Sequence, residues 1–302
     1  MSENRWRARG TRSTLPAVKE EEREYVLGTH DEEIERLGLQ HRVWRSHVLD
    51  AWRRAGIAPG QTVIDVGCGP GYATLDLAEL VGSGGRVVAI DQSRRFLDHL
   101  VSSAERAGCR NIEACERDLA VDDLPHANAD AAWCRWILAF VPDPRALLTR
   151  VAARLRPGGC LVIHEYYDYR SWRLLPPCRS VEEFVATVMS TWRTAGGEPD
   201  VGAMLPAWLS AMGFQIHGVR PLIEIAAPGC PMWRWPEAFL RVGMHRLVRL
   251  GHLAADRADA TLAAFEGAKQ QPGTRMCTPG VIEIIARAPS HDSCVGSAGG
   301  SQ

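Results

Sequence analysis

Short apolar runs alternate with amphipathic stretches across the middle of the chain. The apolar runs have the length of strands and cover residues 62–67, 86–91, 111–118, 129–136 and 160–167. The stretches between them have helical periodicity and cover residues 72–81, 93–107 and 143–156. Gly108 and the Pro157-Gly158-Gly159 turn act as helix stops, and Asp143-Pro144 as a helix start. This alternation predicts a parallel sheet covered by helices on both faces, with ligands bound at the carboxyl ends of the strands.

A helix is predicted before the first strand. Thr29 and Glu32 have the spacing of a capping box. Apolar and aromatic residues then recur at three- and four-residue steps, at Ile34, Leu37, His41, Trp44, Val48 and Trp52. Gly56 ends the pattern.

The regular alternation of strands and helices ends near residue 170. Residues 171–211 and 232–270 are expected to be mostly helical, with a capping box at Ser180 and Glu183, a helix start at Pro236 and a helix end at Gly251. Strands are expected within 213–226 and 281–289. We therefore divide the chain into a disordered tail (1–24), an N-terminal helical lid (25–57), a core (58–170), helical cap insertions with the last two strands (171–289) and a second disordered tail (290–302).

Composition narrows the function classes. The 302 residues are 46% hydrophobic with a formal net charge of −1, so no basic excess indicates nucleic acid. No apolar stretch approaches membrane-span length, and the charged N-terminus does not look like a secretory signal. The nine cysteines form no CxxC pair, which favours free thiols, no metal and a cytoplasmic location over a metal or catalytic cysteine site. The sequence does not indicate an oligomeric state.

The segment VIDVGCGPGYATLDLA, residues 63–78, joins the first strand to the next helix through a glycine-rich turn. The dinucleotide fingerprint G-x-G-x-x-G fails in both frames, because Tyr72 or Thr74 stands where the third glycine belongs. No Gly-Lys-Ser/Thr follows, so the turn is not a P-loop either.

The pattern D-V-G-C-G-P-G resembles motif I of the class I S-adenosylmethionine-dependent methyltransferases. The resemblance continues in order along roughly residues 60–165, through Asp91 in VVAIDQS, Asp118 in ERDL, RWILAFVPDP and LRPGGCLVIHE. It implies a Rossmann-like, doubly wound, mostly parallel seven-stranded sheet with an antiparallel last strand. The N-terminal helix and the insertions resemble the small-molecule branch near the ubiquinone/menaquinone-biosynthesis methyltransferases.

The resemblance also implies how S-adenosylmethionine is held. The backbone of Gly67, Cys68, Gly69 and Gly71 would approach the methionine and ribose parts of the ligand. Asp91, beside Gln92, would accept hydrogen bonds from the ribose hydroxyls, and Asp118 with the Leu119 amide would bind adenine. The remaining expected cofactor contacts are Asp65 and the Arg135 carbonyl at the ammonium, and Tyr25 from the lid. Asp65 and Asp118 have alternative roles as a loop brace and a turn former.

The implied reaction is methyl transfer to the oxygen, nitrogen or carbon of a small apolar or aromatic molecule. Glu165 or His164 is the candidate general base, and Trp136, Tyr166, Tyr167 and Trp235 are the candidate substrate contacts. His164 lies inside a strand, where a core histidine is the competing interpretation, and the tryptophans of the insertions could form the core of a cap instead. A relative that binds S-adenosylmethionine but catalyses a cyclisation, hydroxylation or decarboxylation would need the same cofactor residues. A non-catalytic binding module is disfavoured by the intact glycine and aspartate motifs.

Overall fold

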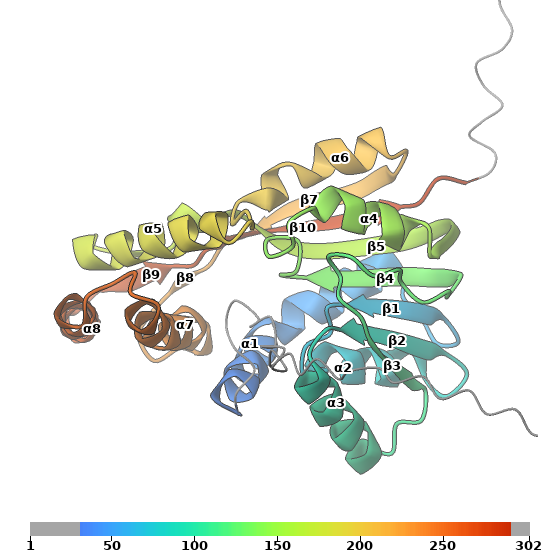
Figure 1. The fold of residues 1–302 in the computed structure, drawn as a ribbon, viewed down its shortest axis with the longest axis horizontal. Helices are drawn as coiled ribbons and strands as arrows, with labels where there is room; N and C mark the ends of the chain where they lie inside the picture. Colours follow the sequence, from blue (N-terminus) through green and yellow to red (C-terminus); the bar gives the residue numbers. More distant parts are fainter. Residues whose placement is uncertain (1–30, 291–302) are drawn as a thin grey trace, which may run out of the picture.

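The computed structural model describes residues 31–290 and contains a seven-stranded sheet in the order β3-β2-β1-β4-β5-β10-β7 (Figure 1). Its strands are β1 (Thr62–Val66), β2 (Arg86–Asp91), β3 (Ile112–Glu116), β4 (Ala129–Arg135), β5 (Leu155–Asp168), β7 (Gln215–Leu222) and β10 (Gly280–Arg287). The first five pair in parallel, and β10 runs antiparallel to both β5 and β7. The predicted sheet and its antiparallel last strand are confirmed.

The helices between the parallel strands begin where the sequence predicts. They are α2 (Tyr72–Val81), α3 (Arg94–Ala107) and α4 (Pro144–Ala152). The Ser93 side chain caps α3 by accepting a hydrogen bond from the Phe96 amide at 3.3 Å, and Asp143 caps α4 through the Ala146 amide at 2.9 Å. In Figure 1, α2 and α3 lie on one side of the sheet and α4 on the other.

The predicted end of α4 at residue 156 was wrong. The helix ends at Ala152, and Leu155 already pairs with Ala129 at the start of β5. Sheet pairing therefore overrides the helical periodicity of these residues. The Pro157-Gly158-Gly159 turn lies inside β5 as an irregularity of the strand pairing.

The N-terminal helix α1 (Asp31–Ala55) packs onto the sheet through its aromatic residues. The ring of Trp52 meets that of Trp133 on β4 edge-on at 5.4 Å, and Trp44 meets Trp136 in the same way at 5.4 Å. The predicted apolar face is buried from His41 to Trp52, whereas Ile34 and Leu37 are only half-buried. The expected cap at Thr29, the 1–24 tail and residues 291–302 of the second tail lie outside the described residues.

Most helices of the insertions lie beyond one end of the large sheet (Figure 1), but the helix that precedes β7 packs along that strand. The insertions contain the helices α5 (Arg179–Thr194), α6 (Leu205–Ala211), α7 (Pro231–Arg249) and α8 (Ala255–Lys269), and the 3-10 turns η1 (Tyr169–Ser171) and η2 (Val201–Ala203). A second sheet, in the order β6-β9-β8, is formed by β6 (Arg173–Leu175), β8 (Ile225–Ala226) and β9 (Arg275–Cys277). This small sheet was not predicted, because strands of two or three residues carry too little periodicity to be recognised.

Three details of the insertions differ from the expectations. The helix α5 starts at Arg179 without a side-chain cap, so Ser180 and Glu183 form no capping box, and Glu183 pairs with arginines instead. Pro236 lies inside α7, whose first residue is Pro231. The region 213–226 contains two strands, β7 and β8, that belong to different sheets.

Candidate functional site

A pocket opens at the carboxyl ends of β1, β4 and β5. Asp65 of β1, Arg135 of β4 and Tyr166 of β5 line it together with the glycine-rich turn. Arg36, Leu37 and Gln40 of α1 and several aromatic residues of the insertions complete the lining, namely Tyr169, Trp172, Trp192, Trp235 and Phe239. The pocket thus joins the predicted cofactor turn to the cap.

The three glycines of the turn have different physical roles. All adopt positive φ, at 70° for Gly67, 55° for Gly69 and 88° for Gly71. A Cβ atom on Gly67 would lie 2.1 Å from Ile137 Cγ1, and one on Gly71 would lie 2.3 Å from Leu100 Cδ1. A Cβ on Gly69 would meet no atom of residues 31–290 within 4 Å. Gly67 and Gly71 are therefore required by packing, while Gly69 leaves open space beside the pocket.

Asp91 braces the same turn from the end of β2. Its buried carboxylate accepts hydrogen bonds from the Gly69 amide at 2.8 Å and the Ser93 amide at 2.9 Å. The Gln92 amide also contacts this carboxylate, and the acceptor capacity that remains is available to a ligand hydroxyl.

Asp118 follows β3 and lies next to Asp91 along the edge of the sheet, because the Arg117 amide donates to the Asp91 carbonyl at 3.0 Å. The Asp118 side chain accepts from the Ala120 amide at 2.9 Å, which is the turn-forming arrangement weighed as its alternative role. Asp91, Gln92, Asp118, Leu119 and Gly71 do not line the pocket itself.

Asp65 lies at the bottom of the pocket, only 2% exposed. It accepts a hydrogen bond from the Thr74 hydroxyl at 2.7 Å. Burial raises the pKa of Asp65 to about 6, although this hydrogen bond and the charge of Arg135 oppose the rise. A buried carboxylate of this kind can hold a ligand's ammonium group.

The Arg135 side chain lies against the aromatic rings of the pocket, whereas the sequence predicted a contact through the Arg135 carbonyl. Its guanidinium carbon lies 5.1 Å from the ring centre of Trp136 and 5.9 Å from that of Trp133. Its Nη2 donates to His41 Nδ1 at 3.3 Å, and His41 Nε2 donates to Asp76 Oδ2 at 3.0 Å. Burial lowers the pKa of Arg135 to about 10, so the guanidinium remains charged at neutral pH.

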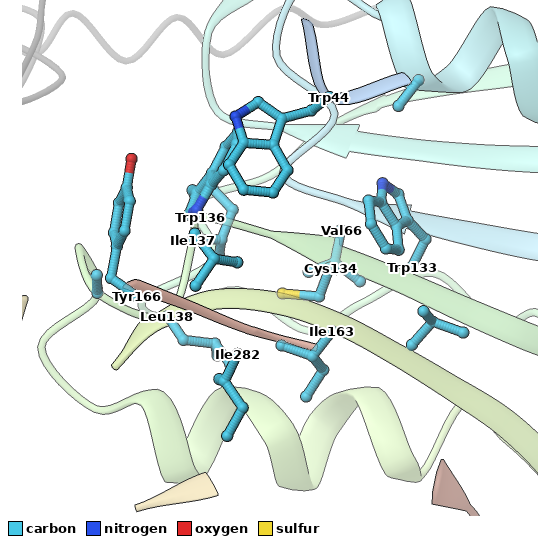
Figure 2. Packing of buried hydrophobic residues seen from close by; sticks show 14 of the residues in the cluster. Trp44, Val66, Trp133, Cys134, Trp136, Ile137, Leu138, Ile163, Tyr166 and Ile282 are labelled. Atoms are coloured by element: carbon cyan, nitrogen blue, oxygen red, sulfur yellow. The ribbon is translucent and has the colours of Figure 1, made fainter. Parts of the chain in front are cut away.

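Three aromatic rings form a stack in the pocket. Trp136 lies between Tyr166 and Trp235, with ring centres 5.5 Å and 5.4 Å away and interplanar angles of 18° and 20°. Figure 2 shows Trp136 and Tyr166 on the side of the strands that also carries Trp44, with Ile163 and Ile282 on the other side. The backbone of Trp136 has φ at 51°, which is rare for a residue with a side chain and is found at functional sites.

Glu165 and His164, the candidate bases, do not line the pocket. Both are 0% exposed. Glu165 accepts the amides of Leu138, Ala139 and Tyr166 at 2.8, 3.3 and 3.0 Å. His164 lies 3.1 Å from Glu283 Oε2 and against the rings of Trp44 and Trp133. Neither side chain can reach a substrate from its position in the interior, so the geometry argues against both as general bases.

Three of the four predicted substrate contacts line the pocket. Trp136, Tyr166 and Trp235 line the pocket, whereas Tyr167 does not, because neighbouring residues of a strand point to opposite faces of a sheet. Tyr25 lies outside the described residues. The pocket is also lined by residues that were not predicted, namely Arg36, Gln40, Tyr72, Tyr169 and Phe239. Of these, only Arg36 and Gln40 could have been recognised from the sequence. They are polar residues four positions apart on a helix, close to its apolar face.

Residues 31–290 contain no candidate membrane-spanning helix, disulfide or metal site. No helix among residues 31–290 is both long and apolar enough to span a membrane. The eight cysteines of this part of the chain are free thiols, and no group of three or more potential metal ligands occurs there.

The glycine-rich turn and the sheet have counterparts in known proteins. Residues 63–159 match the family model of the methyltransferase domain. The demethylmenaquinone methyltransferase of Lactococcus lactis is 29% identical over 126 residues, 42% of this chain and 49% of that protein. The nocamycin O-methyltransferase of Saccharothrix syringae is 28% identical over 202 residues, 61% of this chain and 71% of that protein. This chain spans about half the length of the demethylmenaquinone methyltransferases that it matches.

A solved structure from Bacillus halodurans, proposed to be a methyltransferase, has the same fold at 15% identity, with a TM-score of 0.54, 81% of this chain covered and 100% of the other. The pattern of motifs that follows motif I, with its order along the strands, agrees with this fold and with the matched domain. Residues 63–159 therefore match the methyltransferase domain in sequence and in fold, and S-adenosylmethionine is the cofactor that this match indicates.

Proposed function

We propose that this protein transfers a methyl group from S-adenosylmethionine to a small molecule with a flat aromatic part. The observation that carries the proposal is the single pocket shared by the glycine-rich turn and the stack of Tyr166, Trp136 and Trp235. Flat rings insert favourably against such stacks, and aromatic pairs contribute about 0.5–1.5 kcal/mol beyond the burial of their area. The matched relatives, which methylate small molecules by their names, support the same substrate size.

The residues present fit the cofactor. Gly69 leaves open space where the ligand would approach the backbone, and Asp65 offers a buried carboxylate for the ammonium. Asp91, with Gln92 beside it, would accept the ribose hydroxyls, and Asp118 with Leu119 would contact adenine. Cys68, Gly67 and the carbonyl of Arg135 complete the proposed cofactor contacts. When bound, S-adenosylmethionine supplies an electrophilic methyl group, and the protein's contribution is to place a nucleophile in line with it.

The pocket contributes no obvious side-chain base. Among the described residues that line it, none is a histidine or a glutamate, and the one aspartate, Asp65, already accepts the Thr74 hydroxyl. Tyr166 and Tyr169 can orient a substrate hydroxyl, but burial raises the pKa of Tyr169 well above its ordinary value. The substrate therefore has to bring a group that is already nucleophilic, such as an amine or an acidic hydroxyl.

Titration calorimetry with S-adenosylmethionine, S-adenosylhomocysteine and NAD tests the cofactor assignment. We expect tight binding of both adenosyl compounds, no binding of NAD, and at least tenfold weaker adenosyl binding for Asp91→Ala. NAD binding without adenosyl binding would refute the assignment. The mass of the product from a methyl-acceptor screen then separates methyl transfer, which adds one methylene unit, from a non-methylating reaction.

A further inference from the structure

Two adjacent residues of the pocket carry buried donors without acceptors. Arg135 Nη1 and Trp136 Nε1 are both buried, and neither finds a hydrogen-bond partner among residues 31–290. Both side chains line the pocket. Buried polar groups in proteins are almost always hydrogen-bonded, so a pair of orphaned donors at one site indicates that a ligand supplies the acceptors.

The charge of Arg135 is only partly compensated. Asp65 and Asp76 act on it through space, but no carboxylate of the described residues is hydrogen-bonded to the guanidinium, whose contact at Nη2 is the neutral ring of His41. Arg36, the other arginine of the pocket, differs: it is held by Glu33 through two hydrogen bonds of 2.6 and 2.7 Å. A buried guanidinium whose charge is only partly compensated favours a ligand with negative charge.

We infer that the substrate bound in this pocket is a flat aromatic molecule that carries a carboxylate or another oxyanion, which Arg135 Nη1 and Trp136 Nε1 bind. The inference rests on the proposed function and names its substrate class. S-adenosylmethionine, with one sulfonium, one ammonium and one carboxylate, adds a further positive charge to the site. A cationic aromatic amine is disfavoured, although the aromatic rings alone would accommodate one.

The inference also accounts for the missing base. An oxygen that already carries the negative charge forms its bond to the methyl carbon as the carbon–sulfur bond breaks. The electron pair of that bond stays on sulfur, which leaves a neutral thioether, and no proton has to be removed. The reaction would then be O-methylation of an acid or of an acidic hydroxyl.

The carboxylate of the cofactor is the alternative acceptor for Arg135 Nη1 and Trp136 Nε1. Binding of S-adenosylhomocysteine and of 5′-methylthioadenosine, which lacks the amino acid part, separates the two on the full chain. We expect Arg135→Gln to change the affinity for S-adenosylhomocysteine by less than threefold. A tenfold loss for S-adenosylhomocysteine with unchanged 5′-methylthioadenosine binding would assign Arg135 to the cofactor and overturn the inference.

Substrate recognition is tested with 2-naphthoate and 2-naphthamide, which share a shape but differ in charge. Each compound is titrated into the protein with and without saturating S-adenosylhomocysteine. We expect the wild type to prefer naphthoate by tenfold or more, Arg135→Gln to lose the preference, and Arg135→Lys to keep part of it. The matched control is Arg145→Gln, which removes an exposed arginine of α4 and should leave the preference unchanged.

Equal affinity for acid and amide, or no binding of naphthoate to the wild type, would overturn the inference. Thermal melting of each variant shows whether a loss comes from unfolding, and Arg135→Lys keeps the test decisive if Arg135→Gln does not fold. Failure of S-adenosylhomocysteine to bind the wild type would instead refute the proposed function, while the titration without it still measures the charge preference.

Discussion

The carboxylate of Glu165 accepts a hydrogen bond of 2.8 Å from the Leu138 amide, which ties β5 to the turn that follows β4. The same oxygen also accepts the Ala139 amide, at 3.3 Å. This turn carries Trp136 and Ile137, so the fully buried carboxylate shapes the wall of the pocket from behind. A residue that the sequence indicated as a base therefore acts on the site through the backbone.

Glu165 should make stability fall as the pH rises. Burial raises its pKa from the ordinary value of 4.5 to about 7, although backbone amides oppose the rise. Between these two values the folded chain binds more protons than the unfolded chain, so the free energy of unfolding decreases with pH. Glu165→Gln, which does not titrate, should remove up to about 3 kcal/mol of this decrease between pH 4.5 and 7. Urea unfolding of both proteins at several pH values measures it, and parallel curves for the two would contradict the prediction.

Alanine substitutions at Gly71 and Gly69 should have different effects, the first mainly on stability and the second mainly on cofactor binding. Gly71→Ala places a Cβ against Leu100 at a φ of 88°, so we expect a loss of stability of more than about 2 kcal/mol. Gly69→Ala meets no such clash and should cost about 1 kcal/mol, yet it should weaken S-adenosylhomocysteine binding at least tenfold. Thermal melting and calorimetry on both variants test this, and an unchanged affinity in Gly69→Ala would count against the proposed approach of the ligand.

At position 136, a glycine variant should be more stable than an alanine variant, which is the reverse of the usual order of stability. Both Trp136→Ala and Trp136→Gly remove the ring, but only glycine adopts the φ of 51° without strain. We expect the glycine variant to be more stable than the alanine variant by about 1 kcal/mol. Denaturant unfolding of the matched pair measures the difference. Greater stability of the alanine variant would show that the backbone relaxes when the ring is removed.

Glu283 should dominate the acid sensitivity of the sheet. Burial alone would raise its pKa, but hydrogen bonds from His164, Arg220 and Arg54 lower it to about 2. A depressed pKa stabilises the folded chain above the ordinary value of 4.5, and this stabilisation is lost as the pH falls toward 2. Glu283→Gln should therefore lose about 2–3 kcal/mol at pH 7, and the deficit should shrink in acid. A deficit that does not depend on pH would mean that the loss comes from packing alone.

The order of strands and helices follows from the sequence because each element carries its own local signals. The Asp143 cap, the Gly108 stop and the apolar strands act within a few residues, so their positions are predicted well. The glycine-rich turn, Asp91 at the end of β2 and Asp118 after β3 could be identified from their places relative to the strands. A parallel sheet brings the ends of neighbouring strands to one edge, so these residues were expected to share a site.

The tertiary structure decided which side chains after β4 and in β5 reach the pocket. Residues 164 to 167 follow one another in the sequence, yet only Tyr166 faces the pocket, while Glu165 is enclosed by the backbone of the next turn. The aromatic stack joins residues 136, 166 and 235, and the packing around Arg135 leaves its Nη1 without an acceptor among residues 31–290. Contacts between segments so distant in the chain depend on the packing of the whole core, which no local pattern encodes.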